Sequence, residues 1–126
     1  MPLDTEREER GRRAYYAGDA AESGVERHYK ERGLTAIARR WRGCGGEIDL
    51  IFGNGSERIF VEVKKSSTFA RAAERISPKQ SRRLLAAAQE YLANEPCGLL
   101  TDARFDVALV NCSGEVRVLE NALTTG

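Results

Sequence analysis

The sequence predicts an α/β fold, in which a mixed central sheet lies between two helical layers in a three-layer α/β/α sandwich. Two observations lead to this prediction. Short runs rich in β-branched and aromatic residues alternate with two longer stretches whose apolar residues recur at helical spacing, in the order α-β-β-β-α-β-β. The first three strands follow one another closely and predict an antiparallel meander, from which the second helix returns the chain to two further strands.

The chain begins with residues 1–17, a charged segment in which Glu and Arg alternate. We interpret it as an N-terminal extension that forms a helix only through close-range ion pairs and frays because it has little to bury. A single domain then covers residues 18–126. Its first helix is predicted over residues 19–32, with Gly33 as the residue that ends it. Four residues mark the inner face of this helix: Ala21, Val25, His28 and Tyr29.

Three strands follow the first helix. The first is predicted over residues 34–42. Residues 46–51 and 59–65 are the next two, and both are rich in Ile and Val. The intervening Gly53-Asn54-Gly55-Ser56 is typical of a tight hairpin turn, so the second and third strands are expected to pair directly.

The second half of the chain contains one long helix and two strands. Residues 65–77 are polar and are predicted to form an irregular, mobile loop. Ser77 as N-cap and Pro78 in the first turn then open the helix. Strands predicted over residues 104–110 and 115–119 complete the sheet. We see no internal repeat and no linker, so the 126 residues predict one domain.

The distribution of charged and apolar residues indicates the kind of partner and the location to expect. The formal net charge is only +1, but one short interval is basic and contains a single acid, Glu74; its cations are Arg71, Arg75, Lys79, Arg82 and Arg83. Such a stripe suits a polyanion, and a solvated helix face explains it equally well when it is taken alone. No stretch approaches the roughly 18 apolar residues of a membrane span, and no apolar leader is present, which predicts a cytoplasmic protein without membrane contact.

The cysteines do not predict a disulfide framework or a zinc site. Cys44, Cys97 and Cys112 are odd in number and far apart, and with the single His28 they match no zinc-binding spacing. We expect reduced thiols. His28 lies alone on the inner side of its helix, which favours a packed residue over a metal ligand.

Three charged residues stand out in two strands that are otherwise apolar. Alternation along a strand places Glu62 and Lys64 on one face and their valine neighbours on the other. Asp49 lies on the partner strand of the hairpin, close enough to meet Glu62. We therefore expect two carboxylates and one ammonium group to converge, as in a site for metal-dependent hydrolysis of a phosphodiester.

Magnesium is the cation that these residues suit, because Mg²⁺ prefers one or two carboxylates with water over a cage made only of protein. Asp49 and Glu62 would supply the carboxylates, and the backbone carbonyl of Val63 would add a ligand. Lys64 would orient or deprotonate the attacking water, or stabilise the transition state. Glu22 on the first helix is a candidate for a further contact, direct or through water. Mn²⁺ is the alternative cation.

A purely structural interpretation is a ladder of salt bridges between Glu62 and Lys64 on a solvated face. The predicted topology argues against it, because helices on both faces leave little water above a central strand. Unpaired charges there cost several kcal/mol and persist where a cleft or a metal uses them. The glycine-rich residues 43–46 lead into a strand and not into a helix, which favours a structural turn over a phosphate-binding loop.

Ordered motifs along most of the chain resemble one protein family. They are Glu22 with Gly33, Arg42 through Gly46, Glu47 through Ile51, Phe60 through Lys64, Phe69, Glu74, Ser77-Pro78, Arg104 through Val107 and Glu120 through Ala122. Over residues 12–123 the chain is similar to the YraN-like family of small uncharacterised bacterial proteins. That family is assigned to the restriction-endonuclease-like superfamily with its PD-(D/E)xK site.

The resemblance implies a restriction-endonuclease-like sandwich and an active site at four positions that the chemistry also selects: Glu22, Asp49, Glu62 and Lys64. The chain departs from the family pattern at two places. Gln80 stands where Lys is usual, with Lys79 beside it, and some nucleases of the superfamily carry a Gln on this helix. Ser66 stands where Arg is common.

The leading functional prediction is a Mg²⁺-dependent endonuclease acting on DNA, with branched or flapped repair and recombination intermediates as candidate substrates. Six residues are expected to contact the nucleic acid: Gln80, Lys65, Lys79, Arg71, Arg75 and Arg82. The alternatives are a nucleic-acid-binding module that has lost catalysis and a protein-interaction subunit. Pairing of two copies as a homodimer is left open, as is the choice between DNA and RNA.

Overall fold

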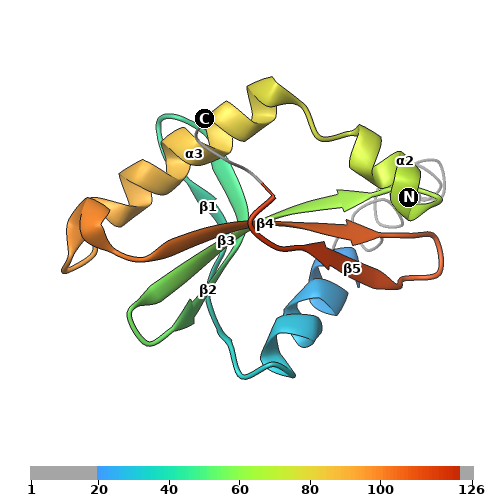
Figure 1. The fold of residues 1–126 in the computed structure, drawn as a ribbon, viewed down its shortest axis with the longest axis horizontal. Coiled ribbons are helices and arrows are strands. Elements are labelled where there is room, and N and C mark those ends of the chain that lie inside the picture. Colours follow the sequence, from blue (N-terminus) through green and yellow to red (C-terminus); the bar gives the residue numbers. More distant parts are fainter. Residues whose placement is uncertain (1–19, 123–126) are drawn as a thin grey trace, which may run out of the picture.

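The computed structural model describes residues 20–122, which form a five-stranded mixed sheet with helices on both faces (Figure 1). The strands are β1 (Thr35–Arg42), β2 (Glu47–Asn54), β3 (Glu57–Lys65), β4 (Ala103–Val110) and β5 (Val116–Leu119). The helices are one of residues 20–30, α2 (Phe69–Glu74), α3 (Pro78–Leu92) and the short 3-10 turn η1 (Gly98–Leu100). The predicted α/β class and order of elements are confirmed apart from α2, and the charged extension of residues 1–17 lies outside the described part.

The strands lie side by side in the order of the sequence, with β3 in the centre. Neighbouring strands are antiparallel except β3 and β4, which are parallel and paired continuously from Arg58↔Ala103 to Lys65↔Val110. The ladder between β2 and β3 is shorter and ends at Leu50↔Val61. The strand β2 therefore leaves β3 at Asp49, and the sheet opens beyond that residue.

Each face of the sheet carries its own core, which explains the two helical layers in Figure 1. On one face, Val61 and Phe52 pack with Val25 and Tyr29 of the helix of residues 20–30. On the other face, buried residues of the sheet pack under α2 and α3: Ile48, Ile51, Phe60, Val107 and Leu109. The alternation predicted for β3 is thus confirmed, and it directs Glu62 and Lys64 to the same side as Phe60.

The long helix α3 forms as the sequence predicts. Ser77 is its N-cap, and the Ser77 hydroxyl accepts a hydrogen bond of 3.1 Å from the Gln80 N–H. Pro78 occupies the first turn, where its missing N–H costs no helical hydrogen bond. The buried residues of the helix recur at helical spacing: Leu84, Ala87, Ala88 and Leu92. Burial of this stripe against the sheet fixes the rotation of α3 and hence the direction of Gln80.

Removal of this N-cap is expected to weaken the fold measurably. The Ser77→Ala variant leaves the Gln80 N–H without its side-chain acceptor, and such substitutions cost about 1 kcal/mol of the free energy of unfolding. Urea denaturation followed by circular dichroism measures the loss. Ser77→Asp, which keeps an acceptor oxygen, is the matched control and should unfold like the wild type; an equal loss in both variants would contradict the capping role.

The prediction of an irregular loop over residues 65–77 is wrong, because this segment contains α2. The Thr68 hydroxyl caps the helix by accepting a hydrogen bond from the Arg71 N–H, and Ala72 is fully buried against the sheet. The Arg117 guanidinium of β5 lies over the Phe69 ring, 4.5 Å from its centroid. A helix of six residues is unstable by itself, so these tertiary contacts and not local propensity form it.

Two smaller predictions, on Gly33 and on the cysteines, are confirmed. Gly33 follows the first helix with φ of +83°, the left-handed conformation in which glycine ends helices. Cys44, Cys97 and Cys112 are exposed free thiols. Within residues 20–122, every helix is too short or too polar to cross a membrane.

Candidate active site

The candidate site lies where β2 separates from β3. Past Leu50↔Val61 the two strands no longer pair, so the N–H of Val63 needs another acceptor. The Asp49 carboxylate provides it, with Oδ2 2.8 Å from the Val63 nitrogen. The divergence of the strands thus turns Asp49 from the edge of β2 toward β3, as the sequence predicts.

Lys64 is fixed between the sheet and α3. Its side chain is buried, and its Nζ lies 3.1 Å from Glu62 Oε1. The same ammonium group donates a hydrogen bond of 2.7 Å to Gln80 Oε1 on α3. The sequence predicts that Gln80 contacts nucleic acid, which stays a prediction; in the structure its side-chain carbonyl oxygen accepts the hydrogen bond from Lys64. Glu62, Lys64 and Gln80 form one connected network.

The carboxyl groups of Asp49 and Glu62, hereafter the carboxylate pair, interact directly. Burial and the neighbouring Asp49 carboxylate raise the pKa of Glu62 to about 7. Burial also raises the pKa of Asp49, against the opposing effects of the Val63 N–H and Lys64. In the metal-free protein Glu62 therefore holds its proton to near neutral pH, because the second negative charge beside Asp49 is unfavourable.

A pocket of about 200 Å³ adjoins Asp49 but is not lined by Glu62, and its lining comes from both helical layers and the sheet: Ala21, Glu22, Asp49, Val63, Lys64, Lys65 and Arg75. The structure thus brings the predicted residues Glu22, Asp49 and Lys64 to one place, together with two of the predicted nucleic-acid contacts. Of these, Arg75 donates a hydrogen bond of 2.7 Å to the Lys65 carbonyl. The other predicted basic contacts are exposed on α2 and α3 and do not line this pocket: Arg71, Lys79 and Arg82.

The donor set for a metal is small. Within residues 20–122, no group of three or more His, Cys, Asp or Glu side chains lies close enough together to hold a metal ion. Glu22 lies in the pocket but pairs with Arg40, with 3.3 Å between Glu22 Oε2 and Arg40 Nε. The carboxyl groups that lie together are thus Asp49 and Glu62, with the Val63 backbone beside Asp49. This set fits Mg²⁺, which keeps several waters and needs one or two carboxylates.

The glycine-rich residues 43–46 form a structural turn, as expected. The Glu90 carboxylate of α3 accepts the N–H groups of Cys44, at 2.9 and 3.0 Å, and of Gly45, at 3.3 Å. These N–H donors lower the pKa of Glu90. The Glu90 carboxylate thus satisfies the N–H groups of the turn before β2 and connects this turn to α3.

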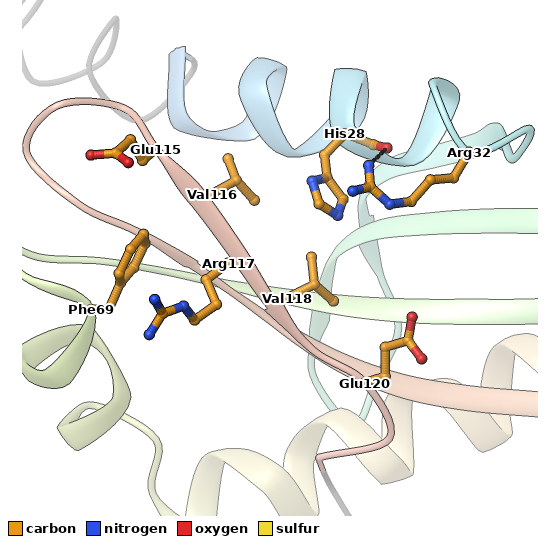
Figure 2. A pocket seen from close by; sticks show the side chains of 8 residues that line it. All are labelled: His28, Arg32, Phe69, Glu115, Val116, Arg117, Val118 and Glu120. Atoms are coloured by element: carbon orange, nitrogen blue, oxygen red, sulfur yellow. Dashed lines mark hydrogen bonds between the residues drawn. The ribbon is translucent and has the colours of Figure 1, made fainter.

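A larger cavity of about 470 Å³ lies at the β5 edge of the sheet and shares no residue with the carboxylate pocket. Figure 2 shows Val116 and Val118 pointing toward the helix of residues 20–30, and Arg117 on the opposite side beside Phe69. His28 is half-buried here, and burial, followed by nearby Arg32, lowers the pKa of its imidazole. His28 thus lines the cavity with its ring edge-on to that of Tyr29, 5.7 Å between centroids.

Sequence reasoning missed a buried polar network on the opposite face of the sheet. Asp106 of β4 is fully buried, and it accepts hydrogen bonds from the Tyr29 hydroxyl at 2.7 Å and from Arg104 Nη2 at 2.9 Å. The Asn121 N–H donates a third bond of 2.9 Å. A charged residue inside the apolar run of β4 was the available signal, because a buried carboxylate requires partners of this kind.

The chain matches one family and close relatives. The model of uncharacterised protein family UPF0102 matches residues 21–110. A UPF0102 protein of Roseobacter denitrificans is 54% identical over 126 residues, which cover 100% of this chain and 98% of that protein. A UPF0102 protein of Ruegeria pomeroyi is 55% identical over 93% of this chain and 95% of its own. A third, of Cereibacter sphaeroides, is 54% identical over 89% and 96%. The chain therefore belongs to uncharacterised protein family UPF0102, the YraN family that its motifs resemble.

Proposed function

We propose that this chain is a metal-dependent nuclease that hydrolyses phosphodiester bonds in DNA, built on a restriction-endonuclease-like fold. One observation carries the proposal: the carboxylate pair, Lys64 and Gln80 meet where β2 separates from β3, beside a pocket that the sheet and both helical layers line. The family is uncharacterised, so the proposal depends on this geometry. A mixed sheet covered by helices on both faces is consistent with the fold that the motifs imply.

The carboxylate pair is the natural place for Mg²⁺ or Mn²⁺. Asp49 and Glu62 would bind the cation, with the Val63 carbonyl as a further ligand and Glu22 as a contact through water. Two half-buried carboxyl groups in contact repel one another when both are ionised, and a divalent cation would relieve this repulsion. When bound, the cation would supply positive charge at the scissile phosphate and lower the pKa of the attacking water.

The remaining residues would position the reaction. Lys64, held by Glu62 and Gln80, orients the attacking water and stabilises negative charge on the phosphoryl oxygens. The water oxygen forms the new bond to phosphorus and loses a proton to bulk water, and the bond to the leaving oxygen breaks as that oxygen gains a proton from bulk water. The basic residues of the pocket and of the nearby helix surfaces would contact the DNA backbone: Lys65, Lys79, Arg71, Arg75 and Arg82. We propose branched or flapped DNA as the substrate.

A cleavage screen tests this function. Single-stranded, duplex, flapped and four-way DNA are incubated with the protein and Mg²⁺ or Mn²⁺, and in parallel with excess chelator. We expect cleavage only with the metals, and a loss of about 10²-fold or more in Asp49→Asn. Asparagine keeps an oxygen that can accept the Val63 N–H, so the variant should fold. Asp102→Asn, at an exposed carboxylate, is the matched control and should cleave normally.

Each outcome of the screen separates the candidate functions. Cleavage that survives the chelator, or that is equal in Asp49→Asn and wild type, would contradict the nuclease proposal. DNA binding with a steep salt dependence but without cleavage under any divalent ion would identify a nucleic-acid-binding module. Absence of DNA affinity at low salt would favour a protein-interaction subunit.

A further inference from the structure

Arg40 has an unusual backbone for a residue inside a strand. Its φ is +49°, in the left-handed region, and within residues 20–122 the other non-glycine residue with positive φ is Asn121. Asparagine adopts this conformation readily, whereas arginine has a side chain that clashes with its own backbone there. Outliers of this kind gather at functional sites, where surrounding contacts hold them in place.

The left-handed residue lies directly across from the candidate site. The β1–β2 ladder pairs Arg39 with Leu50 and then Trp41 with Ile48, so the register places Arg40 opposite Asp49. The ladder has no pair at this step, although its register is the same on both sides of it; the register shift between the two strands lies earlier, between Ala36 and Ala38. The left-handed residue of β1 therefore lies across from the point at which β2 leaves β3.

The bend changes which side chains reach which face. Arg39 pairs with Glu26 of the helix of residues 20–30, so regular alternation would direct Arg40 toward α3 and Trp41 back toward the first helix. Instead, Trp41 packs on the α3 face, with its ring 5.5 Å from that of Tyr91. The Arg40 side chain reaches Glu22 on the opposite side. The left-handed conformation of Arg40 thus places its guanidinium group beside the helix of residues 20–30, which borders the pocket.

Glu22 connects Arg40 to the pocket. The Glu22 side chain lines the pocket with Asp49 and Lys64, and its Oε2 lies 3.3 Å from Arg40 Nε. The Arg40 side chain is 42% exposed and is not among the residues that line the pocket, so it reaches the surface next to Glu22. Glycine or asparagine would form the same bend with less strain. The presence of arginine therefore indicates that the side chain itself has a role.

We propose that Arg40 is a phosphate-binding residue at the rim of the active site, where it contacts the DNA backbone next to the bond that is cleaved. This inference rests on the proposed nuclease function. A guanidinium group suits phosphate because its parallel N–H donors match two phosphate oxygens. Glu22 restrains the side chain before DNA binds, so less conformational freedom is lost on binding.

The test compares Arg40→Asn with Arg39→Asn. Asparagine tolerates the left-handed backbone, so Arg40→Asn removes the guanidinium without forcing β1 to rearrange. Arg39 is the adjacent exposed arginine and gives the same change of charge. Binding of fluorescently labelled duplex and flapped DNA is measured by anisotropy in chelator over a range of salt concentrations, and thermal unfolding is recorded for both variants.

We expect Arg40→Asn to bind DNA about tenfold more weakly, with a salt slope reduced by about one, and to keep or raise the midpoint of thermal unfolding. Arg39→Asn should stay within about twofold of the wild-type affinity. Equal losses in the two variants, or wild-type affinity in Arg40→Asn, would overturn the proposal. Wild-type protein that binds DNA but never cleaves it would contradict the nuclease function alone, while the affinity of Arg40→Asn would still decide the phosphate contact. No DNA binding by the wild type would overturn both.

Discussion

Replacing Glu62 with glutamine is expected to abolish DNA cleavage and, at the same time, to stabilise the metal-free protein at pH 8. Glutamine resembles the protonated form of Glu62, so it can donate a hydrogen bond to Asp49 while still accepting one from Lys64. It cannot offer a second negative charge to a divalent cation. We expect cleavage to fall by about 10³-fold, in the range seen when charge-stabilising groups are removed from active sites.

The gain in stability follows from the raised pKa of Glu62. The folded protein binds the Glu62 proton more tightly than the unfolded chain, so its free energy of unfolding falls as pH rises from about 4.5 to about 7. Above that window the wild type carries the full cost of the second charge, on the order of 2 kcal/mol after allowance for partial solvent exposure. Glutamine removes this cost, so the variant should exceed the wild type at pH 8 and resemble it at pH 4.5.

Chemical denaturation in chelator at pH 4.5, 6 and 8 measures this difference, and a cleavage assay with Mg²⁺ measures the loss of activity. Glu74→Gln, at an exposed carboxylate of α2, is the matched control and should change neither quantity. Cleavage by Glu62→Gln at the wild-type rate would show that Glu62 has no role in the reaction. A stability difference that does not depend on pH would contradict the raised pKa.

The Asp106→Ala variant is expected to lose about 3–5 kcal/mol of its free energy of unfolding, the usual range when one partner of a buried ion pair is removed. Asp106 is fully buried and is the shared acceptor for Tyr29, Arg104 and the Asn121 N–H. Its removal leaves these donors without an acceptor on the face of the sheet under the first helix. Arg104 is 28% exposed and can turn toward water, so we expect the lower part of the range.

Urea denaturation at pH 7 measures this loss. Tyr29→Phe is the companion variant, because it removes a single hydroxyl donor and should cost less, about 1–3 kcal/mol. A loss below about 1 kcal/mol in Asp106→Ala would contradict the structural role. The network lies on the face opposite Glu62 and Lys64, so Asp106→Ala should cleave DNA normally at temperatures where it remains folded.

The fold was predictable because local patterns and tertiary contacts agree in most of the chain. Strand alternation in β3 and the capped, periodic helix α3 predicted their own boundaries and faces. The helix α2 was not predictable, because its six residues owe their conformation to the burial of Ala72 and the contact between Phe69 and Arg117. Those partners are far apart in sequence.

Much of the candidate site was also predictable, because local patterns in its strands agree with their tertiary contacts. Charged residues in apolar strands identified Asp49, Glu62 and Lys64, and hairpin pairing brought them together. Two features could not be inferred. The partner of Glu22 depends on a left-handed residue in β1, and arginine gives no sequence signal for that conformation. The role of Gln80 as the acceptor for Lys64 depends on how α3 is rotated over the sheet.

The two ends of α3 hold two different parts of the site. Near its start, Gln80 holds Lys64; ten residues later, Glu90 holds the turn that leads into β2 and Asp49. These anchor points are about 15 Å apart along the helix axis. The single helix α3 therefore sets the spacing between Lys64 and Asp49. Substitutions on the buried side of α3 would therefore change the geometry of the site and hence its chemistry, although they would replace no charged residue of the site.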